Sequence, residues 1–374
     1  MVSTIPAFGL GAMSVLVTSW LWKQLRRLVF RAVSDRETGE QRRKSCPPSK
    51  DLSADYCTFL PGCFEVETSK GANLVNDRGF LTLRNGDNIF YQTWVPSSGT
   101  VDAGLVIIHG FGDECDFQKA LMAKALASMG NLAVATFDLP GHGRSDGLHA
   151  YVPDWHLFVD AAREIIMDHL RPLLSKDRKD LKIFGLGESM GGGILFSMLV
   201  QEKEIFDGAI LICPMLYVSR ELFPPWIVVQ IFRYLAVPLL PQWPVAPNKD
   251  IGAFLYQDPS VKAACERSAH SRIDLGGVPP RLATAYSLAF VAGEWMRHKI
   301  PEYDTPSLIF HGGGDVVTDP RVSQQLFADM AHADKEFNFP DGVWHADLFH
   351  GGPSQYNSNR KRYEAVVAWI KKRC

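Results

Sequence analysis

The sequence predicts an α/β fold built on a doubly wound, mostly parallel sheet. Two observations lead to this prediction. Short runs rich in valine, isoleucine, leucine and phenylalanine recur along the chain, and stretches of helical character separate them. Strands that are apolar throughout are typical of sheets covered by helices on both faces, and a regular alternation of strand and helix gives parallel strands. Ligands of such sheets bind at the carboxyl ends of the strands.

The expected elements begin with a hairpin, because residues 79–96 (GFLTLRNGDNIFYQTWVP) alternate in polarity around Asn85-Gly86. An Asn-Gly pair between two alternating runs indicates a two-residue turn. The expected buried strands are 103–110, 131–141, 180–187, 207–215, 306–315 and 335–340. The expected helices are 117–129, 154–170, 189–202, 320–331 and 357–372. The alternation is interrupted by one long insertion, between the strands at 207–215 and 306–315.

The bulk composition is that of a large globular protein. The chain has 374 residues, of which 46% are hydrophobic, and a net charge of −2. A chain so close to neutral has no strong field for nucleic acid, so that class of partner is not expected. The seven cysteines are scattered without a CxxC pair, which favours free thiols and a reducing compartment. The spacing of cysteine and histidine indicates no metal site.

The N-terminus differs in composition from the rest of the chain. Residues 1–33 form an apolar segment that includes the 18-residue uncharged run IPAFGLGAMSVLVTSWLW, followed by the basic run KQLRRLVFR. This length is at the lower limit for a membrane anchor, and the basic flank would leave the body on the cytoplasmic side. A cleaved secretory signal fits less well, and an organelle-targeting peptide is an alternative because no acidic residue precedes Asp35. Residues 34–64 are polar and are expected to form a linker to the body, which spans 65–374.

One serine is placed as a nucleophile would be. The motif GESMG (187–191) lies between an expected strand and an expected helix, with Ser189 at its centre. A nucleophile elbow requires this strand–turn–helix context, and Gly187 and Gly191 remove side chains that would clash in so tight a turn. The alternative is a glycine-rich turn that binds phosphate or nothing. Because a serine hydroxyl is a poor nucleophile, it also needs a base, an orienting acid and an oxyanion hole.

The acid and the base are expected in the order serine, acid, histidine. Asp315 lies at the carboxyl end of its expected strand, where an orienting acid belongs. Asp319 precedes a proline and is better explained as the N-cap of the next helix. His345 and His350 lie in the last loop before the C-terminal helix. His345 is closer to the preceding strand and is the predicted base, with His350 as the alternative.

The oxyanion hole is expected from the loop HGFGDE (109–114), which follows the first buried strand. Such a loop can aim a backbone N–H at the charge that develops on an ester oxygen. The expected donors are the N–H groups of Phe111 and of Met190, the residue after the serine. His109 is expected to brace the loop rather than to react. A site of this composition needs no cofactor and no metal.

These motifs resemble the monoglyceride lipase and lysophospholipase family of α/β-hydrolase serine hydrolases, over residues 65–374. The resemblance implies an α/β-hydrolase fold with an inserted helical cap, Ser189 as nucleophile, Asp315 and His345 as its partners, and the same two oxyanion donors. It also implies that His142, in a structural loop, is not part of the triad. Some plant members of the family act on phenolic esters. The motifs that carry the resemblance are HGFGDE, FDLPGHGRSDG, GESMGG, HGGGDVVTDP and GVWHADL, with CPM, PPW and PRLATAYSL in the cap.

The insertion at about 216–303 is expected to be this cap. Its segment 222–244 (LFPPWIVVQIFRYLAVPLLPQWP) has one charged residue, Arg233, and five prolines that would break a continuous membrane span. The segment is either a buried helix packed on the body or a lid that lines an acyl channel and touches a lipid surface. So apolar a cap favours a fatty-acyl ester over a small polar one.

The resulting hypothesis is a serine hydrolase that cleaves the fatty-acyl ester of monoacylglycerol through an acyl-enzyme, at a membrane or lipid-droplet surface. A lysophospholipase, a caffeoyl-type phenolic esterase and an acyltransferase would use the same triad. A non-catalytic, lipid-binding protein of the same fold is the alternative outside the enzymes. It would be expected to have lost a triad residue or an elbow glycine, and here all of them are present.

Overall fold

The computed structural model describes residues 38–53, 73–97, 101–176, 178, 180–219, 223–244, 251–267 and 280–374. The apolar segment 1–33, interpreted as a membrane anchor, lies outside these residues, as do residues 34–37 and 54–64 of the expected linker. Among the helices of the described ranges, none has the length and apolar character needed to cross a membrane.

The sheet has the predicted doubly wound form. Its eight strands lie in the order β1-β2-β4-β3-β5-β6-β7-β8, antiparallel from β1 to β4 and parallel from there on. The predicted hairpin is present, but its turn is longer than the two residues expected, because the last paired residues are Thr82 and Asn88. Gly86 lies in this turn with a φ of +91°. All six predicted strands are present as β3 to β8. Five of them are buried throughout, whereas β8 lies at the edge of the sheet and its side chains are half-buried or exposed. The strands are β1 (Leu74–Thr82), β2 (Asn88–Pro96), β3 (Ala103–Ile108), β4 (Leu132–Phe137), β5 (Ile183–Glu188), β6 (Ala209–Ile212), β7 (Ser307–Phe310) and β8 (Lys335–Asn338).

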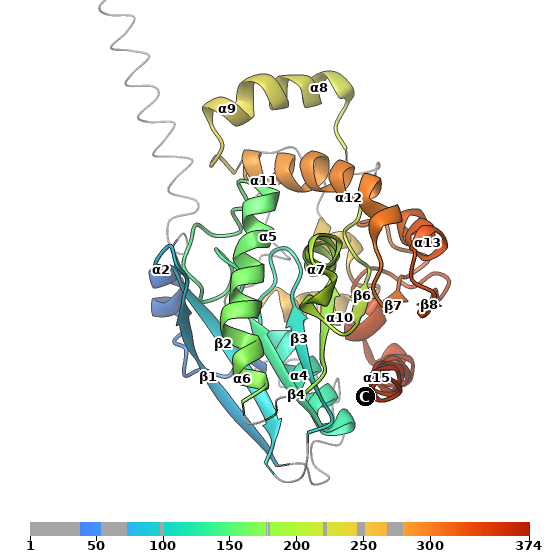
Figure 1. Ribbon diagram of the computed structural model, residues 1–374. Coiled ribbons are helices and arrows are strands. Elements are labelled where there is room, and N and C mark those ends of the chain that lie inside the picture. The colour runs from blue at the N-terminus through green and yellow to red at the C-terminus, as the bar shows by residue number, and fades with distance from the viewer. Residues whose placement is uncertain are drawn as a thin grey trace, which may run out of the picture.

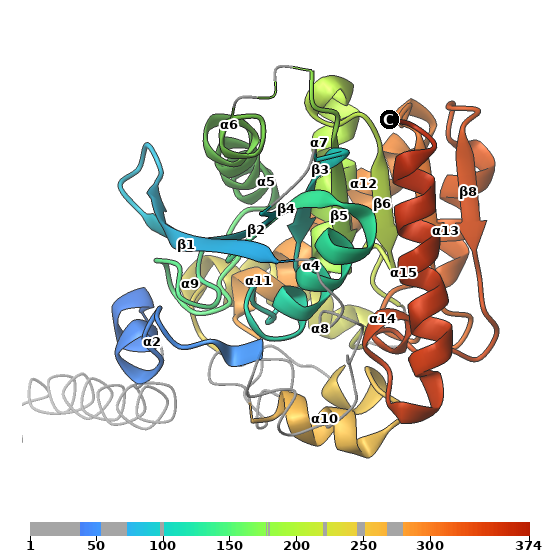
Figure 2. The same cartoon turned by 90° about the horizontal axis from the view of Figure 1, so that it is seen from below.

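Helices cover both faces of this sheet (Figure 2). Alternate side chains of β3 point to opposite faces, and both faces are buried. Leu105 and Ile107 belong to one core with α4 (Phe117–Gly130) and α15 (Tyr356–Lys371). Val106 belongs to the other core, which includes residues of α5 (Trp155–Glu164), α6 (Arg171–Leu174), α7 (Met190–Gln201) and α13 (Pro320–Asp329). A π-helical stretch joins α5 to α6.

A helical cap is inserted between β6 and β7, as predicted. Figure 1 shows α8 and α9 as the outermost layer of the molecule, above α11 and α12. Phe232, between α8 and α9, packs against Leu282 of α11 and holds the outer layer to the inner one. The cap helices are α8 (Trp226–Ile231), α9 (Val237–Leu239), α10 (Pro259–Cys265), α11 (Leu282–Tyr286) and α12 (Gly293–Lys299), and the short α14 (Asp347–His350) follows the sheet.

Part of the polar N-terminal stretch packs against the body. Helix α2 (Gly39–Ser45) begins with a capping box at Thr38. Arg42 of this helix is fully buried and donates hydrogen bonds to backbone carbonyls of the loop 141–147. Leu52 is buried against Phe117 and its neighbours at the start of α4. The described part of the expected linker is therefore in close contact with the loop 141–147 and with the start of α4.

Candidate active site

The site lies where the strand order reverses. β3 has β4 on one side and β5 on the other, so the connections that leave β3 and β5 diverge at their carboxyl ends. This is the position at which doubly wound sheets bind ligands. The loop 109–114 follows β3, and Ser189 follows β5 directly.

Ser189 occupies the strained turn of a nucleophile elbow. Its φ is +54° and its ψ is −117°. Residues other than glycine rarely adopt this backbone conformation, and those that do are often found at functional sites. A Cβ atom at Gly187 would lie 2.4 Å from the carbonyl oxygen of Gly191, and a Cβ at Gly191 would lie 2.1 Å from that of Ile108. The predicted strand–turn–helix context is present, and both glycines are required for the reason given by the sequence.

The predicted oxyanion donors flank this serine. A Cβ atom at Gly110 would lie 3.3 Å from the Cβ of Ser189 and 3.8 Å from its Oγ, so the loop that carries Phe111 faces the nucleophile. Met190 is the first residue of α7, where a backbone N–H has no acceptor within its own helix. The residues that precede the two predicted donors, Gly110 and Ser189, therefore lie in contact with each other.

His109 braces the loop, as predicted. Its Nδ1 lies 2.7 Å from the carbonyl oxygen of Gly110, and its Nε2 accepts a hydrogen bond of 3.0 Å from the N–H of Leu139. Burial lowers the pKa of this imidazole. A neutral His109 therefore joins the loop after β3 to the loop after β4. His142 lies in that second loop, with its Nδ1 3.0 Å from the carbonyl oxygen of Pro140.

Asp315 and His345 form a buried acid–base pair. The Nδ1 of His345 lies 2.6 Å from the Oδ2 of Asp315, and their residues are 3% and 5% exposed. Burial alone would lower the pKa of His345, but the charge of Asp315 outweighs it and raises the pKa above its usual value. Burial alone would raise the pKa of Asp315, but the charge of His345 and hydrogen bonds from both His345 and His311 hold it well below its usual range. Asp315 is therefore ionised and orients the ring of His345.

The turn after β7 completes the environment of Asp315. Its Oδ1 accepts the N–H groups of Val317 and Thr318 at 2.7 and 3.1 Å, and its Oδ2 accepts the hydroxyl of Thr318 at 2.8 Å. His311 approaches the same Oδ2 to 3.1 Å. Asp319 caps α13 through the N–H of Arg321 at 3.0 Å, as predicted. The two aspartates thus have the separate roles that the sequence assigned.

His350, the alternative base, faces a different set of side chains. Its Nε2 lies 3.0 Å from the Oε2 of Glu188 and 2.9 Å from the Nζ of Lys119. Lys119 also contacts Asp113. None of these three partners was predicted as a site residue, although Asp113 and Glu188 lie inside the HGFGDE and GESMGG motifs. Of the two histidines, His345 is the one that pairs with the acid.

Cys213, Asp315 and His345 place three ligand atoms within 4.8 Å of one another, close enough for a metal ion. The chemistry of the donors favours an acid–base pair instead. The thiol of Cys213 donates to the carbonyl oxygen of His345 at 3.3 Å, and burial raises its pKa well above the usual range. A protonated thiol is a poor ligand, because metals bind the thiolate. The described cysteines, at 46, 115, 213, 265 and 374, are free thiols, as predicted.

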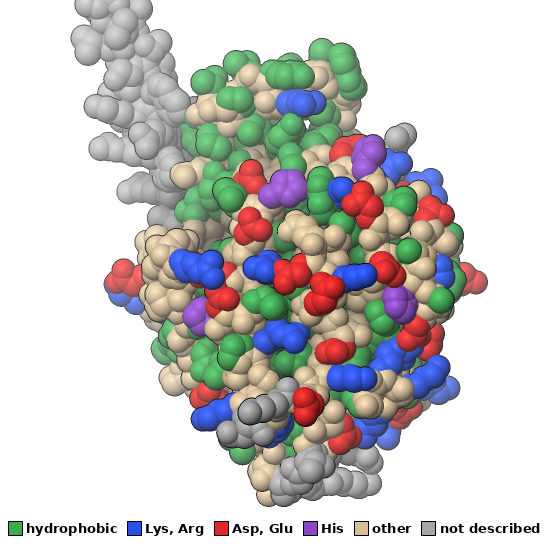
Figure 3. All heavy atoms as spheres, in the orientation of Figure 1, with side chains coloured by type: hydrophobic (Ala, Val, Ile, Leu, Met, Phe, Trp, Pro, Cys, Tyr) green, Lys and Arg blue, Asp and Glu red, His purple; other side chains and the backbone are tan. Residues whose placement is uncertain are grey.

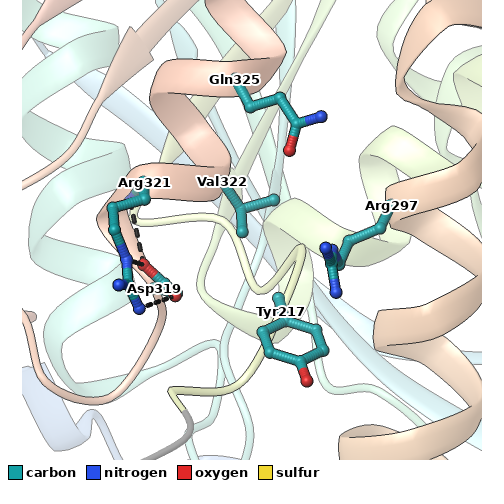
Figure 4. Close-up of a pocket in the computed structure, with 6 residues that line it drawn as sticks. All are labelled: Tyr217, Arg297, Asp319, Arg321, Val322 and Gln325. Carbon is teal, nitrogen blue, oxygen red and sulfur yellow. Dashed lines mark hydrogen bonds and ion pairs between the residues drawn. The ribbon is translucent and has the colours of Figure 1, made fainter.

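A cavity of about 260 Å³ opens beside the turn that carries Asp315. Arg297 of α12 packs over the ring of Tyr217 at 4.9 Å, and Arg321 pairs with Asp319 on the other side of the cavity (Figure 4). The other lining residues are Val322 and Gln325. None of the predicted catalytic residues lines this cavity, so it is distinct from the arrangement around Ser189.

Comparison with known proteins places this site in a family context. The family model described as serine aminopeptidase, S33, matches residues 99–350, which include the elbow, the acid and both histidines. The chain is 28% identical to caffeoylshikimate esterase of Arabidopsis thaliana, over 84% of this chain and 91% of that protein. It is 27% identical to monoglyceride lipase of Mus musculus, over 72% of this chain and 83% of that protein.

Solved structures agree on the fold. A soluble variant of monoglyceride lipase from Saccharomyces cerevisiae, in complex with a substrate analog, superposes with a TM-score of 0.63 at 20% identity. The match covers 80% of this chain and 95% of the yeast one. A monoacylglycerol lipase from Paleococcus ferrophilus superposes with a TM-score of 0.57, also at 20% identity, over 81% of this chain and 100% of the other. Together these matches confirm the predicted α/β-hydrolase fold.

Proposed function

Because the chain belongs to the serine aminopeptidase, S33, family of α/β-hydrolases, we propose that it cleaves the fatty-acyl ester of a monoacylglycerol to a free fatty acid and glycerol. The chain is an ester hydrolase. Monoglyceride lipases from mouse, rat, human and yeast are among its relatives, at 26–27% identity, which supports this choice of ester.

The proposed mechanism uses the groups assembled at the carboxyl end of the sheet. His345, oriented by Asp315, takes the proton of Ser189, which attacks the ester carbonyl. The N–H groups of Phe111 and Met190 stabilise the negative charge on the carbonyl oxygen. His345 returns its proton to the departing glycerol oxygen. Water, activated by the same histidine, then releases the fatty acid from the acyl-enzyme.

One observation favours a lipid ester over a small polar ester: the outer cap helices expose large apolar side chains. Figure 3 shows hydrophobic side chains gathered over this part of the surface. We name the residues concerned the cap face. The exposed fractions of its side chains are Trp226 72%, Ile227 58%, Ile231 55%, Tyr234 68%, Leu235 57% and Leu239 67%.

So large an apolar patch is unusual on a protein that contacts only water. We propose that the cap face rests on a membrane or lipid-droplet surface, from which the substrate enters the site. The exposed apolar side chains of the cap face support the lid hypothesis, in which an apolar helix touches the lipid and admits an acyl chain. The N-terminal apolar segment would then act as a second attachment, with the catalytic body on the cytoplasmic side, or as an organelle-targeting peptide.

The substrate proposal is tested by measuring fatty acid release from a long-chain 2-monoacylglycerol, with Ser189→Ala as the matched inactive protein. We expect release by the wild type and loss of at least about 10³-fold in the variant, because the nucleophile is gone. A lysophospholipid and a caffeoyl ester are run beside it. Preference for either of them would move the proposal to that substrate and leave the triad intact.

A phenolic ester is the second candidate substrate. It is favoured by the likeness to caffeoylshikimate esterase, which extends over 91% of that protein. Acyl transfer is a separate question, because the same acyl-enzyme can pass its acyl group to an alcohol instead of water. Supplying excess glycerol or a lysolipid and analysing the products distinguishes the two reactions. Acylated alcohol as the main product would identify a transferase.

The lipid-surface proposal is tested by sedimentation with phosphatidylcholine vesicles. Ile231 and Leu235 are each more than half exposed, so replacing both by serine should remove about 1 kcal/mol of apolar contact per residue. We expect roughly 10- to 30-fold weaker binding. Val75→Ser is the matched control, because Val75 of β1 is also 55% exposed but lies outside the cap. Equal binding of all three proteins would contradict the proposal.

A further inference from the structure

Four titratable side chains form a buried cluster beside the nucleophile. The Nζ of Lys119 lies 2.9 Å from the Oδ2 of Asp113, 2.7 Å from the Oε2 of Glu188 and 2.9 Å from the Nε2 of His350. Lys119 and His350 are each 1% exposed, and the two acids are each 6% exposed. We name this group the Lys119 cluster. The mechanism above uses none of its members.

The cluster keeps its charges although it is buried. Burial alone would lower the pKa of Lys119, but the two acids outweigh it and raise the pKa above its usual value. Burial alone would raise the pKa of Glu188, but Lys119 and His350 hold it well below its usual range. Burial, and then the charge of Lys119, lower the pKa of His350. One ammonium therefore faces the carboxylate of Glu188, the side chain of Asp113 and a neutral imidazole.

Stability alone is a weak reason to bury such a group. Taking each ion out of water costs several kcal/mol, and well-packed apolar side chains often replace a buried ion pair without loss. A role in fixing geometry is a better explanation, because the ammonium contacts three segments that are far apart in the chain. The segments also meet one another directly, where His350 contacts Glu188 and where Gly110 packs on Ser189, and Lys119 contacts all three at a single atom.

Each of the three segments carries a group of the proposed mechanism. Glu188 immediately precedes Ser189 at the end of β5. Asp113 lies in the oxyanion loop, and its N–H donates a 3.3 Å hydrogen bond to the carbonyl oxygen of Gly110, the residue that packs on Ser189. His350 ends α14, which begins two residues after His345. Lys119 itself is on α4, a helix packed along the sheet.

We propose that Lys119 is a positioning residue for ester hydrolysis: its ammonium fixes the oxyanion loop, the nucleophile elbow and the segment after His345 relative to one another. This inference rests on the proposed function, since it assumes that these segments carry the reacting groups. Oxyanion stabilisation depends on donors that are already in place when charge develops, and small displacements of catalytic groups are costly. The four side chains of the cluster lie outside the cap, so substrate capture by the cap face should not depend on them.

The test compares Lys119→Met with a variant in which Asp113→Asn and Glu188→Gln accompany Lys119→Met. The single change leaves two buried carboxylates without a counter-charge and can prevent folding. The triple change removes all three charges while keeping the size of the side chains, so it restores a neutral interior. Lys124→Met is the control on the same helix, because Lys124 contacts Ser53 and Asp51 of the N-terminal stretch.

The folded fraction of each protein is isolated by size-exclusion chromatography, and kcat and KM are measured on 2-monoacylglycerol. We expect kcat to fall about 10- to 100-fold in both Lys119 variants, with KM within about twofold of the wild type. Lys124→Met should retain the wild-type kcat. If Lys119→Met does not fold, the kcat and KM of the triple variant provide the test. The inference is overturned by a folded Lys119 variant that keeps the wild-type kcat, including one in which only KM changes.

The proposed function can fail separately. If the wild type hydrolyses no ester, the function is overturned, and this inference with it. If the wild type is active and loses activity in Ser189→Ala, the function stands whatever the Lys119 variants show. The two results are therefore distinguishable in one set of assays.

Discussion

Replacing Arg42 by methionine should destabilise the whole body, although Arg42 lies in a polar stretch far from the sheet in sequence. Its guanidinium is fully buried. It donates 2.6 Å hydrogen bonds to the carbonyl oxygens of Gly143 and Ser145 and a 3.3 Å bond to that of Gly147. Methionine fills a similar volume but donates nothing, so three carbonyl groups lose a charged donor.

The expected loss follows from these contacts. A hydrogen bond from a charged donor contributes about 1.5–3 kcal/mol to stability, and a buried acceptor left without a donor costs about 1–3 kcal/mol. The longest of the three bonds of Arg42 contributes least, and releasing a buried charge returns part of its desolvation cost. The free energy of unfolding should therefore fall by roughly 3–5 kcal/mol.

Urea unfolding followed by tryptophan fluorescence measures this loss, and the neighbouring residue provides the control. Arg43 pairs with Asp146 at 2.8 Å, where both side chains are about a quarter exposed, and donates one bond to the carbonyl of Arg144. A partly exposed pair of this kind contributes about 1 kcal/mol or less. Arg43→Met should therefore be much milder than Arg42→Met. Equal effects of the two changes would refute the reasoning.

Three further predictions concern the site itself. Asp315→Asn should lower kcat by about 10⁴-fold, because an amide neither fixes the ring of His345 nor stabilises its charge; the measurement is steady-state hydrolysis, and activity within tenfold of the wild type would count against it. His345 must be neutral to accept a proton, and Asp315 raises its pKa, so kcat/KM should fall as the pH falls through a value above the usual pKa of histidine. A pH–rate profile whose acid limb lies below the usual pKa of histidine would contradict this sign. Gly191→Ala should abolish activity and the yield of folded protein, since its Cβ would lie 2.1 Å from the carbonyl oxygen of Ile108. Gly79→Ala should be tolerated in both measurements, because its Cβ would lie 3.5 Å from the nearest side-chain atom.

Much of the fold could be predicted because its determinants are local in the sequence. Apolar runs of strand length, interrupted by helical stretches, are enough to indicate a covered parallel sheet. Ser189 could be identified because the glycines around it are neighbours in the chain. Asp315 and His345 could be identified because each follows a strand, and the carboxyl ends of parallel strands meet at one edge of the sheet.

The Lys119 cluster could not be predicted, because its members are joined only by the tertiary structure. Asp113 and Glu188 lie within recognisable motifs, but no spacing links them to Lys119 or to His350. The same limit applies to Arg42. A stretch rich in charged residues has the composition of a linker, and one of its arginines is buried only because three loop carbonyls converge on it. Charges that become buried are not distinguishable by composition from charges that stay in water.

These two unpredicted features act on the same loop from opposite sides. Arg42 holds the loop 141–147. The N–H of Leu139, two residues before that loop, donates to His109, and His109 contacts the carbonyl of Gly110 in the oxyanion loop. Asp113, at the other end of that loop, is held by Lys119. A loop fixed at both ends can keep its N–H groups aimed at one point without reorganising during the reaction, which is the condition for strong electrostatic stabilisation. Adaptation to an acyl chain would then fall to the cap, whose outer helices bury few of their side chains.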